Sequence, residues 1–251
     1  MDYARLLQSI LDIGQAMLEC GSEVSRAEDS IYRMCKCYGM PRCDVFGLPN
    51  NIQVTVETAD GQILTQVRHV RAGENNFDRL DYLNDLSRYI VNHEPEPAEI
   101  RERFEKVMAR PPLSFWTRMV ASMVAAGGFT IFFSGTMRDG AVSAATAALY
   151  VAVVRLFLHS EDNPFIFNFI AALLMGVCAV GAVHFGLGDR AGTIIVGDIM
   201  LLIGGVGLTN GMRDLLKTDV ISGTLRVINA LMGAAAIAAG VTVAMMIGGL
   251  L

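Results

Sequence analysis

The sequence predicts an α-helical membrane protein, in which a small cytoplasmic α+β domain precedes five transmembrane helices. Charge is the first observation: residues 1–118 hold 14 of the 20 Lys and Arg and 18 of the 25 Asp and Glu. The second observation is that long apolar stretches fill the rest of the chain, at about 113–135, 139–158, 165–188, 191–211 and 225–251. We therefore expect a cytoplasmic domain over 1–112 and a membrane domain over 113–251.

Each apolar stretch is close to the length that a membrane-spanning helix needs, about 20 residues for roughly 30 Å of hydrocarbon. No water reaches that depth, so each segment must satisfy its own backbone, which a helix does. Basic residues gather on one side of the predicted spans and mark the cytoplasmic face. They are Arg110, Arg118, Arg155, Arg213, Lys217 and Arg226, against Arg138 and Arg190 on the other side. This predicts a cytoplasmic N-terminal domain and, with five spans, a C-terminus outside the cell.

The first 112 residues predict a helix–helix–strand–strand–helix–helix domain with one modest core. Apolar residues lie on one face of a helix at 3–20, and Gly21 ends it. Ser22 or Ser25 begins the second helix, which runs to Gly39. Residues 51–58 alternate as a strand does, and a turn at 59–61 leads to a second strand whose register stays open. Helices are expected at 74–93 and 96–109.

The sequence contains no recognisable catalytic motif. The sequence has no phosphate-binding loop, no GxSxG and no HExxH, and the spans offer only His184, Cys178 and a few acids. Cys20, Cys35, Cys37 and Cys43 do not have the spacing of a zinc site. We therefore expect no enzyme activity, no metal and no cofactor. The net charge of −5 argues against a nucleic-acid partner.

Acidic residues within the apolar stretches are candidate functional groups, because a charge costs at least about 2.5 kcal/mol at the bilayer centre. Asp198 lies within the fourth stretch. It is either a carboxylate coupled to protons or substrate, or a structural acid paired with a neighbouring helix. Asp139 opens the second stretch, where a helix N-terminus favours an acid and a capping role is expected.

Residues 204–214, GGVGLTNGMRD, form the most unusual segment. Its four glycines weaken a helix by about 1 kcal/mol each relative to Ala. Such interruptions occur in membranes where the backbone lines a cavity or where helices pack closely, and both readings stay open. In the first reading, Thr209, Asn210, Arg213 and Asp214 offer donors and acceptors to a zwitterion or a carboxylate.

A second cluster of charge is expected on the helix that follows Gly21. Glu23, Glu28 and Asp29 lie there with Arg26 and Arg33. This pattern predicts either a gating or ligand-sensing patch at the membrane entrance, or a solvated helix surface held by salt bridges.

Two segments resemble the threonine/serine exporter family: CGSEVSRAE at 20–28 and MLLIGGVGLTNGMRDLLKTDVISGTLR at 200–226. The resemblance covers nearly the whole chain. Longer members resemble this chain followed by a second set of about five spans, so the chain resembles the split form, the YjjP-like subunit, which works with a separate small membrane subunit. Some members of that form are assigned a dicarboxylate such as succinate. The resemblance implicates Asp139, Thr209, Asn210, Arg213, Asp214, Asp219 and Arg226, and the cost of burial adds Asp198.

The resulting hypothesis is a subunit of a secondary exporter in the cytoplasmic membrane, which moves threonine, serine or succinate outward with the proton gradient. Its expected partners are the small-molecule substrate, the lipid bilayer, a second multi-span subunit and, as an open point, further copies of itself. Arg213 would hold the substrate carboxylate, and Asp198 or Asp214 would take the proton. The alternative is a membrane-anchored ligand sensor or an assembly scaffold.

Overall fold

The computed structural model describes residues 2–71, 75–158 and 163–249, and the chain divides into two compact units. The first, here called the N-terminal unit, comprises Met1–Pro111 together with Val206–Val227. The second, here called the membrane unit, comprises Pro112–Gly205 and Ile228–Leu251. Segment 206–227, which the sequence analysis placed in the membrane domain, is thus grouped with the N-terminal residues.

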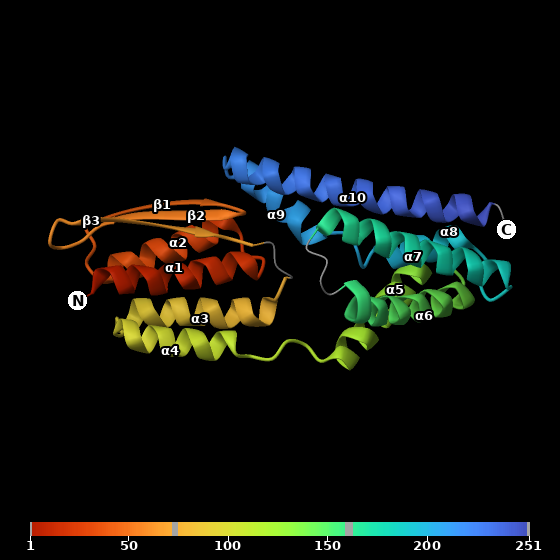
Figure 1. The fold of residues 1–251 in the computed structure, drawn as a ribbon, viewed down its shortest axis with the longest axis horizontal. Helices are drawn as coiled ribbons and strands as arrows, with labels where there is room; N and C mark the ends of the chain where they lie inside the picture. The colour runs from red at the N-terminus through yellow and green to blue at the C-terminus, as the bar shows by residue number, and fades with distance from the viewer. Residues whose placement is uncertain (1, 72–74, 159–162, 250–251) are drawn as a thin grey trace. The chain divides into compact units, whose positions relative to one another are not determined.

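Three layers make up most of the N-terminal unit, and Figure 1 shows the sheet on one side of α1 and α2 with α3 and α4 on the other. The apolar stripe of α1 (Tyr3–Glu19) is the centre of the core: Leu6, Leu7, Ile10 and Leu11 have no exposed surface. The remaining elements are α2 (Val24–Cys37), β1 (Arg42–Leu48), β2 (Asn51–Glu57), β3 (Ile63–His69), α3 (Phe77–His93) and α4 (Pro97–Met108).

The predicted hairpin is confirmed as β2 and β3, and Thr55 opposite Thr65 now sets its register. The alternating residues Ile52, Val54 and Val56 are fully buried, as the period of two requires. One strand was missed, because β1 pairs with β2 and makes an antiparallel sheet in the order β1-β2-β3. Its sequence RCDVFGL alternates poorly and contains a glycine, so it carries a weak strand signal.

The beginning of α2 also differs from the expectation. Its N-cap residue is Glu23, not Ser22 or Ser25, and the Glu23 side chain makes no capping hydrogen bond. The Glu23 carboxylate contacts other groups instead, as described below.

Within the described residues, four helices are long and apolar enough to cross a membrane: α5 (Phe115–Phe132), α6 (Met137–Val153), α7 (Pro164–His184) and α10 (Val220–Gly248). A π-helical turn, Val154–Leu158, extends α6. The expected fourth span is divided into α8 (Ala191–Ile199) and α9 (Gly205–Leu216). Because nine residues of helix cover only about 14 Å, α8 alone does not cross the hydrocarbon. The predicted count of five spans is therefore not confirmed, and residues 250–251 of the expected last span lie outside the described part.

Close backbone contacts hold α8 inside the membrane unit, where it packs against α5, α6 and α7. A Cβ added to Gly197 would lie 2.8 Å from the Thr130 nitrogen and 2.9 Å from the Ala126 oxygen of α5. Only glycine permits this approach. The next residue along the helix is Asp198, so the contact at Gly197 fixes the position of that carboxylate.

Candidate functional sites

The loop between α1 and α2 brings together the two segments that the sequence analysis singled out. Gly21 has a φ of +95°, which reverses the chain after α1. The Gly21 carbonyl accepts a hydrogen bond from Asn210 Nδ2 at 3.5 Å, and the Ser22 carbonyl accepts one from Arg226 Nη2 at 3.0 Å. Residues of α9 and α10 are thereby fixed to the backbone of this loop.

Glu23 lies at the centre of the contact. Its Oε1 accepts a hydrogen bond from Arg213 Nη1, and its Oε2 accepts one from Lys217 Nζ at 3.2 Å. The Glu23 side chain is 9% exposed, whereas those of Arg213 and Lys217 are 50% exposed. Burial alone would raise the pKa of Glu23, but the bonds from Lys217 and Arg213 outweigh it and hold that pKa below its usual value. We call Glu23, Arg213 and Lys217 the Glu23 triad.

A second ion pair lies next to the Glu23 triad, where Arg226 Nε is 3.3 Å from Asp214 Oδ2. Asp214 is 1% exposed, and neither of its oxygens has a hydrogen-bond partner within the described residues. The buried Ser222 hydroxyl also lacks a partner in the described ranges. Asp214 and Ser222 are therefore buried polar side chains whose oxygens have no hydrogen-bond partner among the described residues.

Glycines explain how α9 and α10 come so close. A Cβ on Gly211 would lie 3.1 Å from the Gly223 oxygen, and one on Gly223 would lie 2.8 Å from the Gly211 oxygen. The close-packing reading therefore applies to this pair. By contrast, added Cβ atoms at Gly204, Gly205 and Gly207 would meet nothing within 4 Å. Those three glycines interrupt or begin a helix rather than serve a tight contact.

Asp219 lies beside Asp214, whose backbone oxygen accepts a hydrogen bond from the Asp219 nitrogen at 3.0 Å. Asp219 Oδ1 accepts a hydrogen bond from the Ser222 nitrogen at 3.2 Å, which caps the beginning of α10. Thr209 lies at an exposed position of α9. A substrate-binding role for either residue stays a prediction.

Asp198 is fully buried near the end of α8. Its Oδ1 accepts a hydrogen bond from Ser143 Oγ of α6, and its Oδ2 has no partner among the residues that the structure describes. The bond from Ser143 to Oδ1 is what the reading as a structural acid paired with a neighbouring helix predicts. The unpaired Oδ2 is what the reading as a proton-binding carboxylate requires. Both readings of Asp198 therefore stay open.

Asp139, by contrast, is occupied on both oxygens. It forms a capping box with Thr136 at the beginning of α6, as the helix position predicted. Its Oδ1 accepts from the backbone nitrogens of Asp189 at 2.7 Å and Arg190 at 3.1 Å. These bonds anchor the loop before α8, and they leave little capacity for a substrate or an ion.

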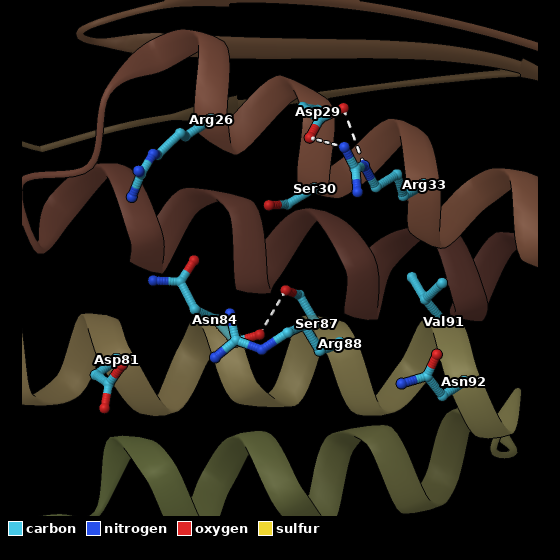
Figure 2. Close-up of a pocket in the computed structure, with 10 residues that line it drawn as sticks. All are labelled: Arg26, Asp29, Ser30, Arg33, Asp81, Asn84, Ser87, Arg88, Val91 and Asn92. Atoms are coloured by element: carbon cyan, nitrogen blue, oxygen red, sulfur yellow. Dashed lines mark hydrogen bonds and ion pairs between the residues drawn. The ribbon is translucent and has the colours of Figure 1, made fainter.

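The charged patch on α2 separates into parts with different roles. Asp29 and Arg33 form an exposed pair at 3.0 Å, which is the solvated alternative. Glu28 turns to the sheet, and its Oε1 accepts from the Gly47 nitrogen at 2.7 Å. Arg26 extends toward α3 into a polar cavity of about 580 Å³ between α2 and α3 (Figure 2). Across the cavity lie Asp81, Asn84, Ser87, Arg88, Val91 and Asn92.

The cysteines of the N-terminal unit are free thiols within or beside the core, and burial raises the pKa of Cys20. No group of three His, Cys, Asp or Glu side chains is close enough to hold a metal ion in the described ranges. Sequence reasoning placed Glu23 in the charged patch of the helix after Gly21 and used Lys217 as topology evidence alone. It joined neither residue to Arg213.

The comparisons with known proteins identify the family of this chain. The sequence model of the family described as "Putative threonine/serine exporter" matches residues 8–248. A curated relative from Mycobacterium tuberculosis (strain ATCC 25618 / H37Rv), named "Probable threonine/serine exporter", is 21% identical over 243 residues. That match covers 96% of this chain and 46% of the relative, so the chain spans about half the length of the curated relative it matches. No solved structure matches the chain significantly. The chain is a multi-pass membrane protein of a transporter family rather than of an enzyme family, and it belongs to the threonine/serine exporter family.

Proposed function

We propose that this chain is one subunit of a secondary exporter, which moves threonine, serine or a dicarboxylate such as succinate out of the cell and is driven by the proton gradient. The family supports amino-acid export in general. The observation that carries the proton-driven part is Asp198, a fully buried carboxylate with one unpaired oxygen among apolar helices. Intramembrane acids of this kind mark proton and substrate pathways.

Substrate binding is assigned to Arg213, with Lys217 beside it. An Arg guanidinium has five donors and binds carboxylates in a bidentate manner. The Arg213 side chain is partly exposed, which leaves donors available to a ligand that approaches from solvent. Asn210 lies on the preceding turn of α9 and supplies an amide of the type that binds an amino-acid headgroup.

The proposed topology places residues 1–112 in the cytoplasm and the C-terminus outside. In this arrangement α8, the break at 200–204 and α9 together form an interrupted fourth span, as discontinuous helices do at the binding sites of many transporters. The proposed partner is a second multi-span subunit. Its support is that the four long helices bury only 17% to 33% of their apolar windows within this chain, and that the curated relative is about twice as long.

The test is efflux from cells preloaded with labelled threonine, serine or succinate, with this chain expressed alone and together with the second subunit. We expect export that stops when the proton gradient is collapsed. Asp198→Asn should reduce export at least tenfold, because the variant cannot change its charge. Asp85→Asn, the same substitution at an exposed position of α3, is the matched control and should leave export unchanged.

The sensor alternative rests on one observation, the polar cavity between α2 and α3. It predicts no efflux of any of the three compounds in any combination, with both proteins present in the membrane. That result would reject the exporter proposal for these substrates.

A further inference from the structure

The Glu23 triad has an unusual distribution of exposure. The anion is nearly covered by protein, while both of its cations are half exposed. An ordinary structural ion pair at a surface has both partners in solvent and contributes about 0–1 kcal/mol. Here two cations converge on one covered carboxylate, and each still presents unused donors outward. The arrangement is that of a carboxylate-binding site whose occupant belongs to the protein itself.

Glu23 has no other task that requires its charge. It is the N-cap residue of α2, but its side chain caps nothing. The loop that carries it is held at its own backbone, because the Asn210 side chain donates to the Gly21 carbonyl and the Arg226 side chain donates to the Ser22 carbonyl. The carboxylate can therefore leave Arg213 by rotation of its side chain alone, since the loop does not have to refold.

We propose that the Glu23 carboxylate is a built-in occupant of a carboxylate-binding site formed by Arg213 and Lys217, and that the carboxylate of the transported substrate displaces it. Glu23 is thus a specificity-determining residue, because only a ligand that offers Arg213 and Lys217 an equivalent anion replaces it. This inference rests on the assignment of Arg213 to substrate binding in the proposed function.

The displacement also sets the apparent affinity of the site. When an internal group competes for the site, the apparent affinity of a ligand is its intrinsic affinity multiplied by the fraction of time that the site is vacant. Removing the charge of Glu23 therefore strengthens carboxylate binding. Removing the charge of Lys217 weakens it, because the ligand loses a cation. A variant that only loosened the fold would change both in the same direction.

The experiment measures the binding of labelled succinate and labelled threonine to the purified full-length chain, in detergent, by equilibrium dialysis. We expect Glu23→Gln to bind about fivefold more tightly than the wild type, which corresponds to loss of a competing ion pair of typical strength. Lys217→Gln should bind more weakly, and the double variant Glu23→Gln with Arg213→Gln should not bind. Asp29→Asn, an acid of the same helix with an exposed partner, is the matched control and should bind as the wild type does.

An unchanged or weaker affinity in Glu23→Gln, with a melting temperature equal to that of the wild type, would overturn the inference, as would an absence of binding in every variant. Export measurements separate it from the proposed function. Proton-dependent export that needs Arg213, with unchanged affinity in Glu23→Gln, would reject the inference and keep the exporter. Tighter binding in Glu23→Gln without export under any condition would keep the inference and reject the exporter.

Discussion

Asp214 depends chiefly on one neighbour for compensation of its charge, and Lys217 makes a smaller contribution. Asp214 is almost completely buried, and Arg226 is the cation beside it. Breaking a buried pair by removal of one partner costs about 3–5 kcal/mol, because the remaining charge is left in a poor environment. We expect Arg226→Met to lower the thermal midpoint of the purified protein by several degrees or more. Much of this loss should return in the double variant Arg226→Met with Asp214→Leu, which leaves no charge unpaired.

Arg88→Met is the control for that experiment, since Arg88 forms an exposed pair with Asp85 and should change the midpoint little. An equal effect of the two single Arg substitutions would contradict the role given to Arg226.

For single residues, the sequence predicted which side chains are buried acids or helix caps more readily than it predicted the residues that they contact. The cost of burial pointed to Asp198, and the helix position pointed to the cap at Asp139. The contact of Arg213 with Glu23 joins residues that are 190 positions apart, and no spacing rule extends that far. Such a pair is determined by tertiary packing, which a single sequence does not reveal.

Among the elements, α8 offers a direct test of packing. Gly197 lies against the backbone of α5, whereas an added Cβ at Gly192 of the same helix would meet nothing within 4 Å. We expect Gly197→Ala to destabilise the protein by about 1–3 kcal/mol through overpacking. Gly192→Ala should be neutral or stabilising by up to about 1 kcal/mol, because alanine favours the helix. Thermal unfolding of both purified variants measures the difference, and equal midpoints would contradict the observed packing of α8.

Helices and the hairpin were predictable because their patterns are local: a stripe on α1, alternation on β2 and a turn at 59–61. Strand β1 was missed because its stability comes from pairing with β2 rather than from its own pattern. The fourth span was predicted as the single apolar stretch 191–211, since hydropathy averages over a window and does not register a break. The sequence analysis noted the glycines at 204 and 205 but left their consequence for the helix open.

For the molecule as a whole, the location of the C-terminus distinguishes five crossings from four. If α8 and α9 together cross the membrane, the two termini lie on opposite sides. We expect a C-terminal alkaline phosphatase fusion to be active and a C-terminal green fluorescent protein fusion to be dark, because each reporter works on one side only. The same reporters fused at the N-terminus serve as controls and should give the opposite result. A fluorescent C-terminal fusion would mean that α8 and α9 do not form a span.

Helix α10 belongs to both units, since Val220–Val227 lies in the first and the rest in the second. It runs for 29 residues, about 43 Å, without a proline. That length exceeds the roughly 30 Å of hydrocarbon, so a membrane accommodates α10 only if the helix tilts or extends past the bilayer surface.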